Sequence, residues 1–348
     1  MSYTNFTVSG LTAYIAQSKD LLIKNLVLGR GTRERISIQT GVKYKEHLHI
    51  LDVDPVFASG LDCGFTGAGT ATLTERLIEC PALQVNMEIC PDNLIGKYAE
   101  YLVRLNANEN SLPFEQYLMD GIIDGINRKI ETMIWLGDKN NQSSDPVKKW
   151  IDGFITIATA SVSASTGVVG ENISSGKTAY EGLKQVAAKM TDNAIERGGV
   201  IFVAPAIFRA FMQDMVALNY YHYNPENDGK EYMLPGTSIK IINTPGMSGS
   251  LKVLGTYEKN LYYGCDMEND NEDVKVWFSE DNQTYRLLAK WNSGVQIAFL
   301  DQCVLGTFAA TPAATLGIAG GVNALVPLAD LAGAYDSTNK YIETHANV

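Results

Sequence analysis

One stretch of the chain has apolar residues at a spacing that places them on a single face of a helix. Between Pro113 and Asp138 the apolar side chains recur every three or four residues. They are Phe114, Leu118, Ile122, Ile126, Ile130, Met133 and Ile134. Pro113 suits a first helical turn, and Gly137 suits a helix end. The spacing predicts a helix of about 23 residues and roughly 35 Å, whose apolar stripe serves packing and not a cofactor.

Two glycines interrupt the predicted helix. Gly121 and Gly125 each weaken it by about 1 kcal/mol relative to alanine. A glycine in this setting lets a neighbouring backbone approach closely, so we expect a strand to lie against the helix at these positions.

The bulk composition limits the class of protein. The 348 residues suit about two compact units, and 45% apolar with 19% charged residues is typical of a globular chain. The net charge of -11 argues against a freestanding nucleic-acid-binding protein, which would carry a basic surface. The five cysteines form no C-x-x-C pair, so we expect reduced, mostly buried thiols in a cytosolic protein.

A long β-hairpin is predicted ahead of the helix. The segments "HLHILDV" and "LTERLIEC" read as its two limbs, and "ASGLDCGFTGAGTAT" between them reads as a glycine-rich tip. The glycine spacing does not fit a phosphate-binding loop. His47 and His49 share one strand face and could begin a metal site, but without a nearby Cys or His cluster we expect exposed histidines.

The first 35 residues read as an arm. Two apolar triplets, residues 21–23 and 26–28, lie in a segment from Lys19 to Lys45 that has seven basic and two acidic residues. A basic segment in an acidic protein suggests an acidic partner surface. We expect the run from Asp266 to Asp273, or another subunit, to provide it. The alternative is an ordinary solvated face.

An α/β unit follows the helix. One helix is expected to carry Leu183 to Ala194 on its inner face and to stop at Gly198. A buried strand, residues 200–204, and a further helix, residues 205–218, come next. A short strand, residues 238–241, then lies between two Pro-Gly turns, with Ile239 and Ile241 on one face and Lys240 on the other.

The last strands read as an antiparallel meander. "DVKVWF" turns at "SEDNQ", "TYRLLAKW" turns at "NSG", and "VQIAFLDQCVLG" closes the set. Beyond residue 308 the chain is rich in Ala, Gly and Thr and reads as an extended tail. The uncharged stretch from Thr307 to Ala329 is long enough to span a membrane, but its prolines and glycines make it too weakly hydrophobic, so no membrane span is expected.

The sequence contains few residues or motifs that are typical of a catalytic site. There are four histidines and no G-x-S-x-G, H-E-x-x-H or paired C-x-x-C motif. The acidic run from Asp266 to Asp273 lacks the frame of a calcium loop. The start of the chain has no basic region followed by an apolar run, so we expect no signal peptide. We expect no catalytic, cofactor-binding or metal site, although an enzyme with a dispersed site stays open.

The order of these pieces resembles the major capsid proteins of tailed bacteriophages, the Hong Kong 97-type fold. The stretch "GVKYKEHLHILDVD…LTERLIECPALQV" is similar to that family's extended loop, and residues 113–138 are similar to its spine helix. "VIFVAPAIFRAFMQDM", "LPGTSIKIINTPGM" and "LKVLGTYEKNLYYGCD" resemble its axial domain, and "VKVWFSEDNQTYRLLAKWNSGVQIAFLDQCVLG" is similar to its returning peripheral strands. The resemblance covers about residues 1–305.

The resemblance implies an α+β chain with six regions. These are an N-terminal arm (1–35), an extended β loop (36–90), a peripheral domain with the spine helix (91–150), an axial α/β domain (151–272), return strands of the peripheral domain (273–306) and a C-terminal tail (307–348).

The implied function is a major capsid protein that self-assembles through pentamers and hexamers into an icosahedral head. The implied partners are scaffolding, portal and head-completion or decoration proteins, around double-stranded DNA that is not read by sequence. The implied location is the virion capsid, assembled in the host cytoplasm. Three alternatives stay open: an encapsulin-type nanocompartment, another non-catalytic virion protein, and a nucleic-acid-binding protein.

We expect subunit contacts on the arm, at the loop tip and at the ends of the Pro-Gly-bounded strand. The candidate residues are Leu22, Leu26, Arg30, Arg33, Gly64, Phe65, Gly67, Leu234 and Met247.

Overall fold

The computed structural model describes residues 18, 22, 23, 25, 31–57, 69–90, 114–140, 145–162, 167–218, 230–266 and 273–312. They form a five-stranded sheet, a six-stranded sheet and a separate two-stranded hairpin. Five helices of the described part lie against the two larger sheets. The chain is therefore α+β, as the sequence predicted.

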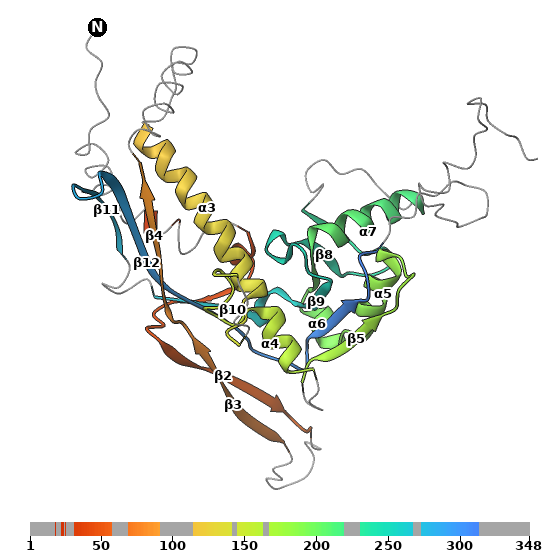
Figure 1. Ribbon diagram of the computed structural model, residues 1–348. Coiled ribbons are helices and arrows are strands. Elements are labelled where there is room, and N and C mark those ends of the chain that lie inside the picture. The colour runs from red at the N-terminus through yellow and green to blue at the C-terminus, as the bar shows by residue number, and fades with distance from the viewer. Residues whose placement is uncertain are drawn as a thin grey trace, which may run out of the picture.

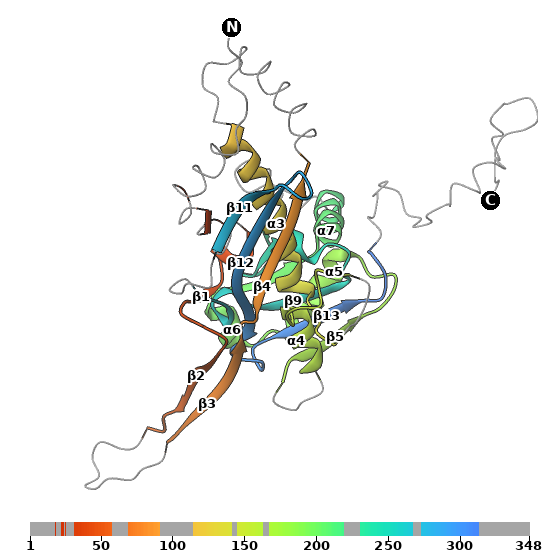
Figure 2. The same cartoon turned by 60° about the vertical axis from the view of Figure 1, so that its left-hand side comes forward.

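The five-stranded sheet is assembled from distant parts of the chain. Its order is β1 (Ser37–Gln39), β10 (Leu261–Cys265), β12 (Thr284–Ile297) and β11 (Asp273–Ser279), with β4 (Ala82–Ile89) also paired to β12. The strand β12 is the centre, because β11 and β4 both pair antiparallel with its first part, residues 284–292, and β10 pairs antiparallel with residues 293–297. Figure 2 shows β4, β12 and β11 side by side.

The long helix α3 (Phe114–Leu136) lies along one face of this sheet (Figure 1). The apolar period predicts its bounds correctly, and Met119, Ile123, Ile126 and Ile130 are buried beneath it. The expectation for the two glycines is wrong. A Cβ added at Gly121 or Gly125 would meet nothing within 4 Å, so no strand makes a close approach there.

The six-stranded sheet forms the second unit. Its order is β5 (Val169–Ile173), β13 (Val304–Phe308), β9 (Lys252–Tyr257), β6 (Gly199–Val203), β8 (Lys240–Asn243) and β7 (Glu231–Met233). The predicted buried strand is β6, in which every residue is buried. The predicted helix after it is α7 (Pro205–Ala217). Ile239 and Ile241 are buried while Lys240 is exposed, so the alternation around β8 is confirmed.

The single helix expected before β6 is two helices. α5 (Ala179–Lys189) ends at Met190, whose backbone is extended, and α6 (Asp192–Glu196) begins after Thr191. The Thr191 side chain accepts a hydrogen bond from the Ala194 backbone N–H. A threonine that caps a helix in this way starts a new helix, and that local signal overrode the continuous apolar period.

The two larger sheets are joined through the end of α3. Trp135 is fully buried, and its ring centroid lies 5.2 Å from that of Phe154 on α4 (Phe154–Ala160) and 4.9 Å from that of Phe202 on β6. The 3-10 helix η2 (Pro245–Met247) packs against the same end of α3. A single hydrophobic core therefore runs through both sheets.

The hairpin extends away from both sheets. β2 (Lys45–Asp54) and β3 (Thr70–Glu79) pair antiparallel over ten residues each. This confirms the two limbs predicted from sequence. Both views show the hairpin projecting from the body of the subunit (Figures 1 and 2). A small second core of Val42, Leu48, Ile78 and Cys80 lies at its base.

The meander is corrected in two places. The "NSG" segment, residues 292–294, is not a turn but the interior of β12, which continues for 14 residues. The closing strand β13 joins the six-stranded sheet, where it pairs with β5 and β9. The return segment therefore supplies strands to both larger sheets. Segment 36–90 supplies β1 and β4 to the five-stranded sheet as well as the two limbs of the hairpin. Among the described helices, none is long and apolar enough to cross a membrane.

Candidate functional site

The surface that most needs a partner is one face of the hairpin. Leu51 and Leu73 lie directly opposite each other in the ladder, and they are 61% and 64% exposed. Val53, two residues along β2 and hence on the same face, is 52% exposed. We call Leu51, Val53 and Leu73 the hairpin patch. Contiguous apolar surface of this kind marks a contact with another molecule.

The hairpin patch was not among the candidate contacts predicted from sequence. Its signal is that β2 is apolar on both faces, since Leu48 and Ile50 point one way while Leu51 and Val53 point the other. Leu48 and Ile50 are buried at 8% exposure each, whereas Leu51 and Val53 on the other face are more than half exposed. Phe57, beyond the end of β2, is 95% exposed.

The two hairpin histidines meet one carboxylate. His47 and His49 share their face with Glu75, whose carboxylate oxygens lie 3.2 and 3.3 Å from their Nδ1 atoms. All three side chains are about half exposed. The expectation of exposed histidines is confirmed. In the part of the chain that the structure describes, no group of three or more His, Cys, Asp or Glu side chains is arranged to hold a metal ion.

Charged side chains link the base of the hairpin to the end of α3. Glu79, the last residue of β3, contacts Lys45 of β2 at 2.5 Å and Lys139 beyond α3 at 2.8 Å. Hydrogen bonds from Lys139 and Lys45 lower the pKa of Glu79 to about 2. Its carboxylate is therefore charged at neutral and mildly acidic pH, where it pairs with a lysine of β2 and a lysine beyond α3.

The corner between β3 and β4 rests on a pair of glycines. Gly264 of β10 and Gly294 of β12 are directly opposite each other in the five-stranded sheet. A Cβ at Gly294 would lie 1.9 Å from the Glu79 carbonyl oxygen, and a Cβ at Gly264 would lie 2.6 Å from the Cys80 sulfur. We call this glycine pair the seat of the hairpin. Only glycines leave room for the corner to approach so closely.

Side-chain amides of β12 flank the seat. The Gln296 amide donates to the Leu77 carbonyl at 2.6 Å, and its oxygen accepts a hydrogen bond from Arg76 at 3.2 Å. On the other side of Gly294, the Asn292 amide donates to the Lys43 carbonyl at 2.9 Å. Burial lowers the pKa of Arg76. The two amides thus bind the backbone of β3 and of the segment just before β2 to one strand.

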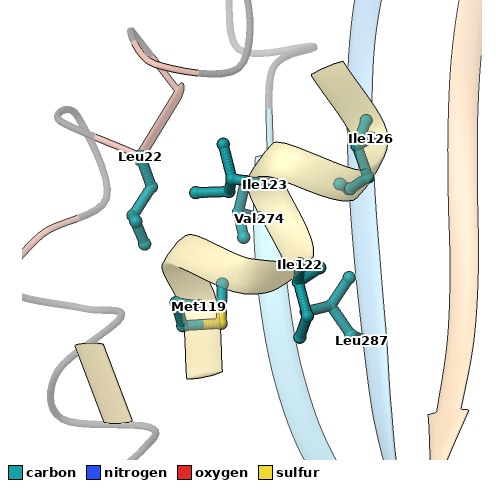
Figure 3. A pocket seen from close by; sticks show the side chains of 8 residues that line it. Leu22, Met119, Ile122, Ile123, Ile126, Val274 and Leu287 are labelled. Carbon is teal, nitrogen blue, oxygen red and sulfur yellow. The ribbon is translucent and has the colours of Figure 1, made fainter. Parts of the chain in front are cut away.

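The arm contacts α3 in the same subunit. Leu22 is 1% exposed and lies over a pocket between α3 and the five-stranded sheet. The pocket is lined by Leu22, Met119, Ile122, Ile123, Ile126, Val274, Leu287 and Ala289. Figure 3 shows Leu22 directed toward Met119 and Ile123. The arm was expected to dock on a neighbouring subunit, and Leu22 instead docks on its own.

A buried polar cluster fixes the root of the arm. Glu131 of α3 accepts hydrogen bonds from the backbone N–H of Thr32, at 3.2 Å, and from its hydroxyl. The Trp135 indole N–H donates to the Thr32 hydroxyl at 2.8 Å. Arg33 is fully buried, and its guanidinium donates to the Asn127 amide oxygen at 2.9 Å. Burial raises the pKa of Glu131, while the Thr32 hydrogen bonds and the Arg33 charge oppose that shift.

Two described residues of the basic segment, Arg35 and Lys45, form ion pairs with acids of the same subunit. Arg35 contacts Glu231 at 2.8 Å and Glu258 at 3.3 Å. Both carboxylates belong to or adjoin the six-stranded sheet, so Arg35 ties the arm to that unit. The expected acidic surface was the run from Asp266 to Asp273. Of that run, Asp266 is fully buried, and residues 267–272 lie outside the described part.

Two predicted contact residues belong to the core. Leu234 and Met247 are 1% and 0% exposed. Met247 lies in η2, which packs on α3, and Leu234 lies at the turn before β8. Because the side chains have no surface to offer, they cannot contact a neighbour directly. The Pro-Gly turns shape the interior of the subunit at this point, and this corrects the expectation.

The other predicted contacts are divided. Arg33 is placed at the arm root, inside the subunit. Leu26 and Arg30 of the arm and Gly64, Phe65 and Gly67 of the loop tip lie outside the described residues. The structure brings Leu22 and Arg33 to α3, on which η2 with Met247 also packs, whereas Leu234 lies at the turn before β8.

The cysteines follow the expected pattern in part. Cys80, Cys265 and Cys303 are buried, whereas Cys90 is exposed. Burial raises the pKa of the Cys80 and Cys303 thiols to about 12. These two thiols are therefore protonated and unreactive at neutral pH.

The fold can be compared with known proteins. No family model matches the chain, and no curated protein matches it by sequence. Among solved structures, a chain of the satellite phage P4 procapsid is similar with a TM-score of 0.57 at 14% identity, over 85% of this chain and 100% of that one. A chain from the capsid of an empty GTA particle is similar with a TM-score of 0.50 at 13% identity, over 81% and 91%.

A chain of the virus-like particle from Pyrococcus furiosus has a TM-score of 0.46 at 12% identity, over 84% of this chain and 98% of that one. The sequence identities are low, so the likeness is one of fold. The hairpin, the long helix and the two sheets described above are arranged as in the Hong Kong 97-type capsid fold.

Proposed function

We propose that this chain, which has the Hong Kong 97-type fold, is the major capsid protein of a tailed phage. In this proposal it assembles through pentamers and hexamers into an icosahedral head around double-stranded DNA. The shell forms in the host cytoplasm and becomes part of the virion. Scaffolding, portal and head-completion or decoration proteins are its further partners. The chain acts by assembly and not by catalysis.

The observation that carries the proposal is the projecting hairpin with its uncovered apolar face. The hairpin patch cannot fold back onto the sheets of its own subunit, because the base is bound to β12 and the limbs point away from the body (Figure 1). Burying a leucine that is now exposed stabilises a contact by about 1.5–3 kcal/mol, and a shell repeats that contact in every subunit. A second copy of the chain is the partner that a closed shell provides.

Further surfaces at the end of the six-stranded unit support contacts between copies. Val216 and Leu218 at the end of α7 are 61% and 47% exposed, and Met233 on the edge strand β7 is 54% exposed. In the proposed shell this end gathers around the five-fold and six-fold axes. The loop tip with Gly64, Phe65 and Gly67, and Leu26 and Arg30 of the arm, remain proposed contacts.

The test is assembly of the purified chain, alone and with a scaffolding protein, followed by light scattering and negative-stain microscopy. We expect closed particles. Leu73→Asp should leave the subunit folded, as judged by circular dichroism, and abolish particles, because a charge is costly in an apolar contact. Thr74→Asp is the matched control, since it places the same charge on the opposite face of β3.

Three outcomes bear on the proposal. A subunit that stays monomeric under every condition, with scaffold present, would contradict it. Loss of particles in both variants would assign the effect to charge on the hairpin and not to the hairpin patch. Particles that enclose a protein cargo and exclude DNA would favour an encapsulin-type compartment over a phage head.

A further inference from the structure

The β2–β3 hairpin must leave the subunit in a fixed direction if it is to reach the same place on every neighbouring subunit. Ten residues per limb correspond to a length of roughly 33 Å. A two-stranded ribbon has little stability of its own and bends easily. Its direction is therefore decided where it joins the body, and the described structure shows how that joint is made.

The joint is made on one strand, β12. Gly294 and its partner Gly264 form the seat on which the corner between β3 and β4 rests. Ile78 and Cys80, on either side of Glu79, are fully buried there. A close approach of backbone to backbone fixes position more tightly than side-chain packing does, because no rotamer can change to absorb a displacement.

Gln296, two residues beyond Gly294 on β12, forms two hydrogen bonds to β3 that further restrict the direction of the hairpin. Its amide group donates to Leu77 and accepts from Arg76, so it binds two consecutive residues of β3. Its oxygen also accepts from the Ile297 backbone N–H at 3.0 Å, which fixes the side chain against its own strand. The Arg76 guanidinium is partly buried and donates to this oxygen, so Gln296 also fixes the Arg76 side chain.

We propose that Gly294 and Gln296 are positioning residues, which set the direction of the hairpin and thereby the curvature of the shell that the subunits build. This inference rests on the proposed function for its second half only. The first half, the direction of the hairpin, is a property of the single subunit.

A small displacement of the backbone at the seat produces a larger displacement at the far end of the hairpin. A Cβ at residue 294 would need the Glu79 oxygen to move from 1.9 Å to ordinary contact at 3.4 Å or more. The corner must therefore shift by about 1.5 Å or rotate. Because the displaced joint lies at one end of a ribbon of roughly 33 Å, a rotation there moves the far end by several times that amount.

The experiment measures the direction of the hairpin in the free subunit. Spin labels are placed at the exposed native Cys90, at the end of β4, and at Thr72→Cys on the hairpin, with Cys63→Ser. The buried cysteines stay unlabelled. Pulsed electron paramagnetic resonance then gives the distance between the two labels. We expect one narrow distance in the parent, and a shifted or broadened one in Gly294→Ala and in Gln296→Ala.

Gly306→Ala is the matched control. A Cβ there would lie 2.5 Å from a methyl of Val186 and 2.7 Å from a methyl of Val253, so it disturbs the six-stranded sheet, away from the seat. We expect it to lower the stability to urea and to leave the label distance unchanged. An unchanged distance in Gln296→Ala and in a folded Gly294→Ala would overturn the inference. The same broadening in Gly306→Ala would also overturn it, since the effect would then be general loosening.

The proposed link between hairpin direction and shell curvature is tested by measuring particle size. Mixed with parent subunits, Gln296→Ala is expected to give particles with a wider spread of diameters by electron microscopy. Uniform particles of parental diameter, with a displaced hairpin, would overturn the link to curvature. If the parent chain forms no particles, the proposed function fails while the distance measurement still decides the role of the seat.

Discussion

Glycine serves opposite purposes at two residues along the long helix and its contact. Gly246 of η2 faces α3 so closely that a Cβ would lie 2.4 Å from the Glu131 carbonyl oxygen and 2.8 Å from the Trp135 ring. A Cβ added at Gly125 of α3 would have no neighbouring atom within 4 Å. The first glycine allows two backbones to meet, whereas the second only weakens the helix.

Alanine substitution at these two residues should therefore have opposite signs. We expect Gly246→Ala to lower the free energy of unfolding by about 1–3 kcal/mol, because the contact is with backbone and cannot relax cheaply. We expect Gly125→Ala to raise it by about 1 kcal/mol through helix propensity. Urea denaturation followed by circular dichroism measures both. Destabilisation by Gly125→Ala would show that the open space is filled in solution.

At the scale of elements, sequence reasoning succeeds where one physical signal dominates. α3 was predicted with nearly its observed bounds and length because its apolar period continues for six turns between a proline and a glycine. The hairpin limbs were predicted because their alternation is bounded by a glycine-rich tip. The buried strand β6 and the helix α7 were found for the same reason.

Prediction failed where a residue type has more than one use. The glycine in "NSG" was read as a turn, but Gly294 lies in mid-strand because another segment crosses it. Nothing near residue 294 in the sequence reveals Glu79, which is more than two hundred residues earlier. Leu234 and Met247 were placed at a surface because Pro-Gly turns usually lie there, although η2 packs inward. Contacts between distant segments decide these cases.

The arm gives the prediction at this scale. Leu22→Ala removes the side chain that fills the pocket on α3, and a buried leucine lost to alanine costs about 2–5 kcal/mol. We expect the loss to appear as detachment of the arm and not as unfolding of the body, because Leu22 contacts the outside of α3 through a single pocket. Trypsin should then cleave after Lys19 and Lys24 several-fold faster, while the melting temperature of the body changes little.

Glu131→Gln provides the comparison for the arm, because it alters the root and not the pocket. An unchanged cleavage rate in Leu22→Ala would show that Leu22 does not hold the arm. Particles formed normally by a chain lacking residues 1–30 would remove the arm from assembly altogether.

At the scale of the whole molecule, charge bears on what the proposed shell encloses. The chain carries a net charge of -11, and Arg33 and Arg35 of its basic segment are used inside the subunit. Each lysine or arginine bound to phosphate adds salt-dependent affinity for DNA. In the proposed head, an inner surface with few such contacts would bind DNA weakly, so the genome could enter and leave. It would also need no contact with the bases.

We therefore expect isolated subunits to bind duplex DNA weakly and without sequence preference. A fluorescence titration at about 0.15 M salt measures this, since screening there leaves only close contacts. The salt dependence of any residual binding should be shallow, because few phosphates are neutralised. Submicromolar, sequence-selective binding would contradict the proposed head protein and favour a nucleic-acid-binding protein.

The central strand β12 lies late in the sequence, and this determines when the base of the hairpin can fold during synthesis. β4 finds its partner only after about 195 further residues have been made, and the seat under the hairpin comes from the same late strand. At roughly 5–20 residues per second, that delay is on the order of 10–40 s. Throughout that delay the hairpin lacks the joint that fixes its direction, so we expect the proposed shell to be built from finished subunits only.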